Sequence, residues 1–269
     1  MEFISEKGLV LLGCGKMGSA MLQGWLDRGL APQSVHVVDP QPSDWLKSTG
    51  VNLNGPLPES PAIALIAVKP QMMRDALPAL QKMGNGDTVF LSVAAGTPIA
   101  HYETVLGAET PVIRAMPNTP AAISRGITAM IGNAHASASA LDMAESLLSA
   151  VGEVVRLESE EQMDAVTGLS GSGPAYVFHL IECMAEAGEK QGLSPDLALQ
   201  LARATVAGAG ALAMQSNENP EQLRINVTSP NGTTQAGLDV LMDEATGLPP
   251  LIAKTVAAAT NRSKELANG

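Results

Sequence analysis

The chain has 269 residues, with 16 Lys+Arg against 27 Asp+Glu and a formal net charge of −11. This acidic balance argues against binding to nucleic acid or to an anionic membrane, because both need clustered Lys and Arg. The 45% hydrophobic content excludes overall disorder, and the length predicts one or two domains. The beginning of the chain does not resemble a signal peptide, and we find no run of about 20 uninterrupted apolar residues that would predict a transmembrane helix. We therefore expect a soluble, cytoplasmic protein.

Residues 1–160 alternate short apolar runs with segments of helical periodicity. Gly, Pro, Asp or Asn bound the apolar runs, whose length suits strands that are covered on both faces. The predicted strands are residues 8–12, 34–38, 62–68, 87–93, 111–116, 126–131 and 153–157, and predicted helices include 17–28, 71–82 and 137–150. This alternation predicts an α/β domain of the Rossmann type, with a doubly wound parallel sheet, over residues 1–160.

Residues 161–269 show helical periodicity without strand signals, which predicts a second, all-helical domain. The predicted helices are residues 174–191, 194–214, 232–245 and 248–266. Ser194, Pro195 and Asp196 are typical of a helix start, since Ser caps, Pro fits the first turn and Asp favours the positive end of the dipole.

A glycine-rich loop follows the first predicted strand and opens a predicted helix. Its residues are Gly13, Cys14, Gly15, Lys16, Met17 and Gly18, in the pattern G-x-G-x-x-G. The first glycine of this pattern allows a tight turn, the second lets the backbone approach a pyrophosphate, and the third lets helix and strand pack closely. The N–H groups at the start of a helix also attract an anion. We therefore predict that this loop binds a dinucleotide.

Asp39 ends the second predicted strand, about 20 residues after the glycine loop. A carboxylate at this spacing binds the hydroxyls of the adenosine ribose and repels a 2′-phosphate, which favours NADH over NADPH. Gln41 and Ser43 follow directly and could still hold a phosphate through hydrogen bonds. The sequence thus leans toward NADH and leaves NADPH open.

The two cysteines, Cys14 and Cys183, lie far apart without CxxC spacing, so we predict neither a disulfide framework nor a zinc site. The four histidines, His36, His101, His135 and His179, show no spacing typical of metal ligands either. No metal is predicted.

Four further motifs occur in a characteristic order: AVKPQ at 67–71, MPNTP at 116–120, LSGSGPAY at 169–176 and VTSPNGTT at 227–234. Together with the glycine loop they closely resemble pyrroline-5-carboxylate reductase over nearly the whole chain. Asn231 stands where many members of that family have Gly, a change that Asn accommodates because it also tolerates a left-handed backbone.

The resemblance implies cofactor contacts beyond the glycine loop. By position in the motifs these are Asn54, Ala67, Val68, Lys69, Pro70 and Asn118, with Lys69 beside the nicotinamide ribose. Taken without the resemblance, the same segments would also fit structural turns.

The segment 228–234 is predicted to hold the substrate. A glycine at the start of a helix, followed by free N–H groups, suits a carboxylate. The resemblance implies that Ser229, Asn231, Gly232, Thr233 and Thr234 bind the carboxylate of 1-pyrroline-5-carboxylate or proline, and that the Thr234 hydroxyl makes the catalytic contact with the ring nitrogen. An N-terminal capping cluster without a ligand is the alternative interpretation.

The predicted activity is reduction of 1-pyrroline-5-carboxylate to L-proline with NADH or NADPH, the last step of proline biosynthesis. The resemblance also implies a homodimer, with a larger ring of dimers left open. One alternative is a β-hydroxyacid dehydrogenase or another imine reductase, which would use a lysine such as Lys190 or Lys254 on a C-terminal helix as the acid. Another is a dinucleotide-binding regulator without catalysis, and the predicted substrate loop argues against it.

Overall fold

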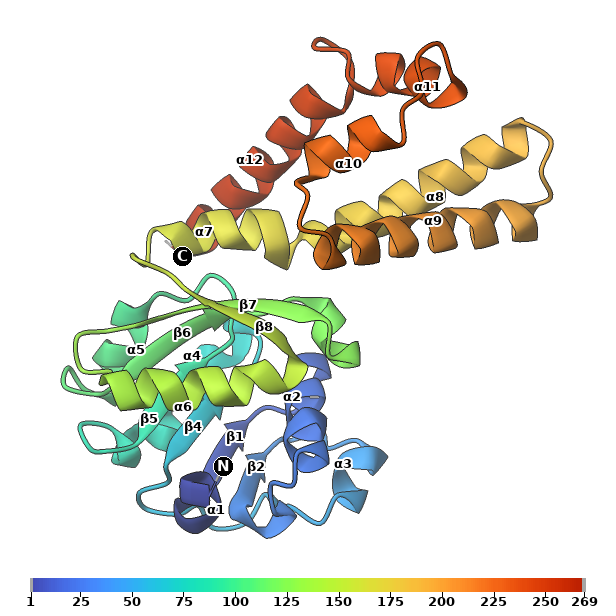
Figure 1. Cartoon of the computed structure of the whole chain (residues 1–269). Coiled ribbons are helices and arrows are strands. Elements are labelled where there is room, and N and C mark those ends of the chain that lie inside the picture. The colour runs from blue at the N-terminus through green and yellow to red at the C-terminus, as the bar shows by residue number, and fades with distance from the viewer. Residues whose placement is uncertain (1, 268–269) are drawn as a thin grey trace. The chain divides into compact units, whose positions relative to one another are not determined.

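A computed structural model describes residues 2–267 of the chain. These residues form two compact units: residues 2–172 together with 259–267, and residues 173–258. The first unit holds an eight-stranded sheet with helices on its faces, and the second is built from helices (Figure 1). The α/β and all-helical regions follow one another along the chain in the predicted order.

The units divide after Ser172, whereas the sequence places the boundary at residue 160. The difference arises because α7 (Gln162–Val166) and the π-helical turn Thr167–Gly171 belong with the first unit. Met163 of α7 is fully buried. The carboxylate of Asp164 accepts a hydrogen bond of 2.6 Å from the Ser263 hydroxyl, near the end of the chain.

The sheet has the strand order β3-β2-β1-β4-β5-β6-β7-β8. Its strands are β1 (Leu9–Leu12), β2 (Val35–Val38), β3 (Asn52–Leu53), β4 (Ile63–Ile66), β5 (Val89–Ser92), β6 (Val112–Met116), β7 (Gly126–Gly132) and β8 (Gly152–Arg156). Neighbours from β3 to β6 pair in parallel. The chain winds outward from β1 through β2 to β3 and then resumes on the other side of β1 with β4. Open α/β sheets bind ligands at such a reversal point, outside the carboxyl ends of the strands.

Three local features differ from the sequence prediction. The edge strand β3 is only two residues long and carries no periodicity that would reveal it. Strand β7 runs antiparallel to β6, because a short 3-10 turn, Thr119–Ile123, reverses the chain without a crossover helix. The predicted helix 71–82 is instead two 3-10 turns, Pro70–Met72 and Leu77–Met83, around the short α4 (Met73–Ala76). Pro78 lacks the N–H that a continuous helix needs there.

Apolar side chains alternate along the central strands, so that each face of the sheet has its own core. On one face, Leu9 and Leu11 pack in a cluster with residues of α2 (Lys16–Asp27) and α6 (Ala138–Leu148). On the other, Val10 and Leu12 pack with residues of α4 and α5 (Ile99–Leu106). Two further short helices, α1 (Glu2–Lys7) and α3 (Asp44–Ser48), also precede β3 in the chain.

Trp25 fixes α2 against α6. Its ring is fully buried, and its indole N–H donates to the Leu147 carbonyl at 2.9 Å. Burial of a large aromatic side chain with its polar atom satisfied is strongly stabilising. The start of α2, which carries the glycine loop, is thereby held by a rigid layer.

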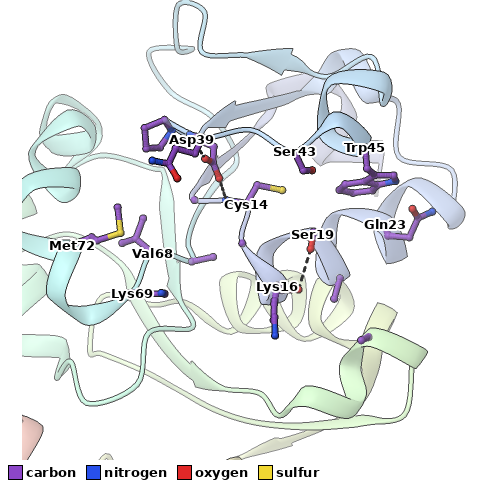
Figure 2. A pocket seen from close by; sticks show the side chains of 17 residues that line it. Cys14, Lys16, Ser19, Gln23, Asp39, Ser43, Trp45, Val68, Lys69 and Met72 are labelled. Atoms are coloured by element: carbon purple, nitrogen blue, oxygen red, sulfur yellow. Dashed lines mark hydrogen bonds between the residues drawn. The ribbon is translucent and has the colours of Figure 1, made fainter.

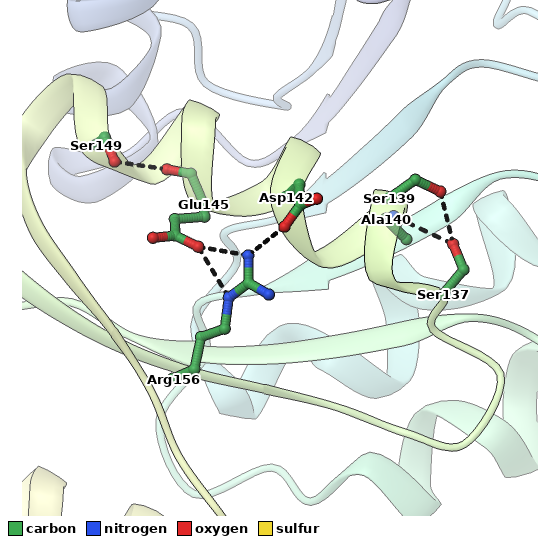
Figure 3. A network of polar contacts seen from close by, with 7 residues as sticks. All are labelled: Ser137, Ser139, Ala140, Asp142, Glu145, Ser149 and Arg156. Carbon is green, nitrogen blue, oxygen red and sulfur yellow. Dashed lines mark hydrogen bonds and ion pairs between the residues drawn. The ribbon is translucent and has the colours of Figure 1, made fainter.

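Two ion-pair systems connect β8 and the segment after it to the rest of the unit. On the surface, Arg156 of β8 bridges Asp142 and Glu145 of α6, at 2.5 Å to each (Figure 3). In the interior, Arg114 of β6 is 4% exposed and pairs with Glu160 at 2.7 Å. The same Glu160 oxygen accepts the Ile99 N–H at 2.9 Å, at the start of α5. The chain between β8 and α7 is thus anchored to β6 and α5.

The second unit contains α8 (Gly173–Lys190), α9 (Pro195–Gln215), α10 (Pro220–Asn226), α11 (Thr233–Leu241) and the first part of α12 (Leu248–Ala267). Helices α8 and α9 pack through Ala185, Ala198 and Ala202, whose small side chains bring the two helices close together. Many large apolar side chains of this unit are exposed, among them Leu212 and Met214 of α9. Among the described residues only α9 has the length and apolar composition that a membrane-spanning helix would need, a property shared by core helices of soluble proteins.

Candidate functional site

The glycine loop lies at the reversal point of the sheet, between β1 and α2. Gly13 has a φ of +88° and lies so close to the segment after β4 that a Cβ would be 2.8 Å from Val68 Cγ1. A Cβ on Gly18 would come 2.5 Å from the Gly13 carbonyl oxygen. Both positions therefore require glycine for the turn and for helix–strand packing.

Gly15 differs from the other two glycines. It is the N-cap of α2 without a side-chain hydrogen bond, and a Cβ there would meet no atom within 4 Å. The space over Gly15 is open, and the helix N-terminus faces it. This is the position at which the G-x-G-x-x-G loop lets a pyrophosphate approach the backbone.

Asp39 is bonded to the glycine loop. Its Oδ2 accepts the Cys14 N–H at 2.7 Å, and its Oδ1 accepts the Gln41 N–H at 2.8 Å. The carboxylate thus joins the end of β2 to the loop after β1. Since each carboxylate oxygen can accept a further hydrogen bond, Asp39 keeps the capacity to bind a ribose hydroxyl.

A cavity of about 950 Å³ opens over the loop. It is lined by Gly13, Cys14, Gly15, Lys16, Ser19, Ala20, Gln23, Asp39, Pro40, Gln41, Ser43, Trp45, Ala67, Val68, Lys69, Met72 and Ala122 (Figure 2). Lys16 at the start of α2 and Lys69 in the segment after β4 bring two positive charges to this cavity. A cavity of this size with an open helix N-terminus, two cations and one acidic group directly after β2 fits a dinucleotide.

Eight of the predicted cofactor residues line this cavity: Gly13, Cys14, Gly15, Lys16, Asp39, Ala67, Val68 and Lys69. Met17 and Gly18 of α2 and Pro70 at the start of a 3-10 turn do not line it. Gly18 acts instead through packing, as described above.

The remaining two predicted cofactor residues, Asn54 and Asn118, hold the backbone. Asn54, with a φ of +52°, pairs its side-chain amide with the backbone of Asp39. Asn118 accepts the Ile127 N–H at 3.0 Å and donates to the Ser170 carbonyl at 3.2 Å. In the described structure both asparagines therefore position the loops that carry the motifs.

Asn118 is part of a close approach between the MPNTP loop and the π-helical turn. A Cβ on Gly171 would lie 2.5 Å from the Met116 Cε, so Gly171 and the Met116 side chain are in close contact. Single π-helical turns occur frequently at functional sites. The SGSG motif is thus fixed to the loop that follows β6.

Cys14 lies in the glycine loop, but its thiol is not poised for reaction. Burial, together with a smaller effect of the neighbouring Asp39 charge, raises the pKa of Cys14 to about 12. A thiol with this pKa stays protonated near neutral pH, and the thiolate is the nucleophilic form. Cys14 lines the cavity and belongs to the buried apolar cluster that α2 and α6 share.

Ser19, Gln23, Trp45 and Met72 also line the cavity, although the sequence did not predict them as cofactor contacts. Ser19 and Gln23 are four residues apart on α2 and so share one face of that helix, a signal that was available. Trp45 belongs to the five-residue α3, which is too short to show periodicity.

The predicted substrate loop lies in the second unit, at the start of α11. The N-cap of α11 is Gly232, without a side-chain hydrogen bond, and Thr233 and Thr234 are the first two helical residues. Asn231 has a φ of +59°, the left-handed conformation that the sequence anticipated. Ser229 is not the cap; its carbonyl accepts the Gly232 N–H at 3.0 Å and closes the turn. The first N–H groups of α11 are therefore open to an anion.

The sheet topology, the glycine loop and the cavity define a nicotinamide-dinucleotide oxidoreductase with an added helical unit. A family model described as pyrroline-5-carboxylate reductase dimerisation matches residues 160–266, and one described as NADP oxidoreductase, coenzyme F420-dependent, matches residues 8–96. The chain is 38% identical to the pyrroline-5-carboxylate reductase of Pseudomonas aeruginosa, over 98% of both chains. It belongs to the pyrroline-5-carboxylate reductase family.

Solved structures agree with this assignment. The pyrroline-5-carboxylate reductase of Coxiella burnetii is 32% identical and superimposes with a TM-score of 0.90, over 97% of this chain and 98% of that one. The enzyme from Plasmodium falciparum, solved with NADP bound, is 26% identical with a TM-score of 0.84, over 98% and 99% of the two chains.

Proposed function

We propose that this chain reduces 1-pyrroline-5-carboxylate to L-proline with NADH or NADPH. The observation that carries the proposal is the cavity over Gly15, because an open helix N-terminus between two lysines and Asp39 suits a dinucleotide. Membership of the family supplies the substrate, since the relatives named above bear the name of this activity.

The bound cofactor would supply a hydride to the carbon of the cyclic imine. The protein contributes binding and alignment. Lys16 and the N–H groups of α2 hold the pyrophosphate, Asp39 meets the adenosine ribose, and Lys69 lies toward the nicotinamide ribose. The negative charge of Asp39 would repel the 2′-phosphate of NADPH. We therefore infer a preference for NADH, which removal of the Asp39 charge would weaken.

The start of α11 holds the substrate in this proposal. The N–H groups of Thr233 and Thr234 bind the carboxylate, with Ser229, Asn231 and Gly232 shaping the turn. The Thr234 hydroxyl bonds the ring nitrogen and orients the C=N bond. A neutral hydroxyl is a weak acid, so the proton on nitrogen comes with the substrate or from solvent.

The direct test is oxidation of NADH and of NADPH in the presence of 1-pyrroline-5-carboxylate, followed by absorbance, with L-proline identified as the product. Consumption of cofactor that depends on the imine supports the proposal. Cofactor binding without turnover would support a dinucleotide-binding regulator instead, and turnover of a β-hydroxyacid but not of the imine would support a β-hydroxyacid dehydrogenase.

We further propose that the second unit forms a homodimer. It matches the dimerisation model of the family, and α9 exposes Leu201, Leu212 and Met214. A second copy that covers these side chains would bury apolar area, which stabilises association. A ring of dimers and a cytoplasmic location remain predictions; the latter accords with two free cysteines, Cys14 and Cys183.

A further inference from the structure

Three chemically active side chains meet on α8, outside both candidate sites. His179, Glu182 and Cys183 are spaced i, i+3 and i+4, so they lie on one face of the helix. His179 Nδ1 is 3.0 Å from Glu182 Oε2, and His179 Nε2 is 3.6 Å from Cys183 Sγ. All three side chains are exposed in the chain. The proposed reduction of the imine uses none of them.

The contact with Glu182 determines which imidazole nitrogen carries the hydrogen. An ionised carboxylate only accepts hydrogen bonds, so Nδ1 of His179 must donate to it. In the neutral ring, Nε2 then presents its lone pair on the side of the Cys183 sulfur. A carboxylate that fixes a histidine in this way is the usual partner of a metal-binding imidazole.

The distance between the two remaining atoms suits joint coordination. Zinc binds sulfur at about 2.3 Å and histidine nitrogen at about 2.0–2.1 Å in tetrahedral geometry, which places the two ligand atoms about 3.5 Å apart. The observed separation of Nε2 and Sγ is 3.6 Å. The two ligand atoms therefore already lie at the separation that a shared zinc ion requires.

We propose that His179 and Cys183 form a binding site for Zn²⁺, with Glu182 orienting the imidazole and water completing the tetrahedron. Imidazole and thiolate together select zinc and related borderline ions over Mg²⁺ and Ca²⁺, which prefer oxygen. In the described residues no group of three or more His, Cys, Asp or Glu is placed to hold a metal. The site is thus a two-ligand site with a supporting carboxylate, weaker than a structural zinc centre.

The test is titration of the full-length, reduced protein with Co²⁺ after metals have been removed by chelation. We expect a thiolate-to-cobalt charge-transfer band in the near ultraviolet that Zn²⁺ abolishes by displacement. Cys183→Ser should remove the band, and His179→Ala should weaken binding more than tenfold. Glu182→Gln should keep the band and weaken binding about 10- to 100-fold, the usual effect of losing such a carboxylate.

Two variants serve as matched controls. Cys14→Ser removes the other thiol, and Glu189→Gln removes another exposed carboxylate of α8; both should bind Co²⁺ as the wild type does. Circular dichroism checks that each variant is folded, and His179→Gln repeats the histidine test with a side chain of similar length. The proposal would be overturned if the wild type showed no charge-transfer band, or if the band survived Cys183→Ser. Unchanged Co²⁺ binding in both His179 variants would also overturn it.

Discussion

The side-chain amide of Asn54 pairs with the backbone of Asp39 through two hydrogen bonds. Asn54 Oδ1 accepts the Asp39 N–H at 2.9 Å, and Asn54 Nδ2 donates to the Asp39 carbonyl at 2.8 Å. The Asp39 carboxylate in turn accepts the Cys14 N–H of the glycine loop. A residue that does not line the cavity thus sets the position of one that does.

We expect Asn54→Ala to impair cofactor binding because Asp39 loses the two bonds that hold its backbone. Two hydrogen bonds of about 1 kcal/mol each hold Asp39, so the KM for NADH should rise roughly tenfold while kcat changes little. Steady-state kinetics measure both. Asn52→Ala is the matched control, because Asn52 bonds the Gln33 carbonyl and not Asp39. An equal effect of the two substitutions would show that the pairing with Asp39 is not the cause.

The charge of Asp39 should govern the choice between the two cofactors. In Asp39→Ser the ratio of kcat/KM for NADPH to that for NADH should rise about tenfold, because repulsion of the 2′-phosphate is lost and a tenfold change corresponds to about 1.4 kcal/mol. Both kcat/KM values should also fall, since the N–H groups of Cys14 and Gln41 lose their acceptor. If the ratio of kcat/KM for NADPH to that for NADH fell instead, Asp39 would not lie beside the adenosine ribose.

Gly15 and Gly18 should respond in opposite ways to the same added methyl group. Gly15→Ala places the methyl in open space over the loop, so stability should be unchanged while dinucleotide affinity falls at least tenfold. Gly18→Ala forces a Cβ to within 2.5 Å of the Gly13 carbonyl, which should cost about 1–3 kcal/mol of stability. Thermal unfolding and NADH titration by fluorescence separate the two effects. Unchanged NADH affinity in Gly15→Ala would mean that the pyrophosphate lies elsewhere.

The sequence predicted the glycine loop, its two flanking elements and the helical second unit because each leaves a local signal. Gly13 and Gly18 mark backbone positions that tolerate no Cβ, and the apolar runs have the length of buried strands. The predicted helix over 71–82 was wrong, although Pro78 carried a local signal against it, since proline lacks the N–H for a continuous helix. Each of these features depends on neighbours close in the chain.

What the sequence could not supply is the partner of each polar side chain. Asn54 and Asn118 were associated with the cofactor through motif positions, yet their amides bond backbone atoms 15 and 52 residues away, at Asp39 and Ser170. No pattern of residue types encodes such long-range pairings. The two-residue β3 and the short α3, which brings Trp45 to the cavity, are likewise set by packing.

The interior pair between Arg114 and Glu160 should matter far more for stability than the surface pairs. Glu160→Gln leaves the Arg114 charge buried without its counter-charge, which should cost roughly 3 kcal/mol, at the lower end for such pairs because Glu160 is partly exposed. Urea denaturation measures the change. The matched control is Glu145→Gln at the exposed Arg156 pair, where we expect little change (Figure 3). Equal stability of both variants would refute the assigned role of the interior pair.

Dimer formation should depend on the apolar surface of α9. Leu212 is 55% exposed in the single chain, and Leu212→Glu would place a charge in the interface proposed for the second unit. Light scattering should then show monomers at concentrations where the wild type is dimeric. Phe3→Glu is the control, because Phe3 is 51% exposed but lies outside the region that matches the dimerisation model. A dimer that persists in Leu212→Glu would move the interface away from this part of α9.

The side chain of Thr234 should contribute to catalysis through its hydroxyl group. Thr234→Ala leaves the N–H groups at the start of α11 in place and would remove only the bond proposed between the hydroxyl and the ring nitrogen. A hydrogen bond to a partly charged group contributes roughly 1.5–3 kcal/mol, so kcat/KM for the imine should fall about ten- to a hundredfold. NADH affinity, measured by titration, should remain unchanged because the cavity over the glycine loop is formed by other residues.

Two variants distinguish a role of the Thr234 hydroxyl from a structural one. Thr233→Ala removes a hydroxyl one position earlier on α11, which is not assigned to the nitrogen, and should retain most activity. Thr234→Ser keeps a hydroxyl and should recover most of the loss seen in Thr234→Ala. If all three variants turn over the imine like the wild type, the turn before α11 is only a helix cap. If Thr234→Ala and Thr234→Ser are equally impaired, the methyl group of Thr234 matters through packing, and the contact with the ring nitrogen has no support.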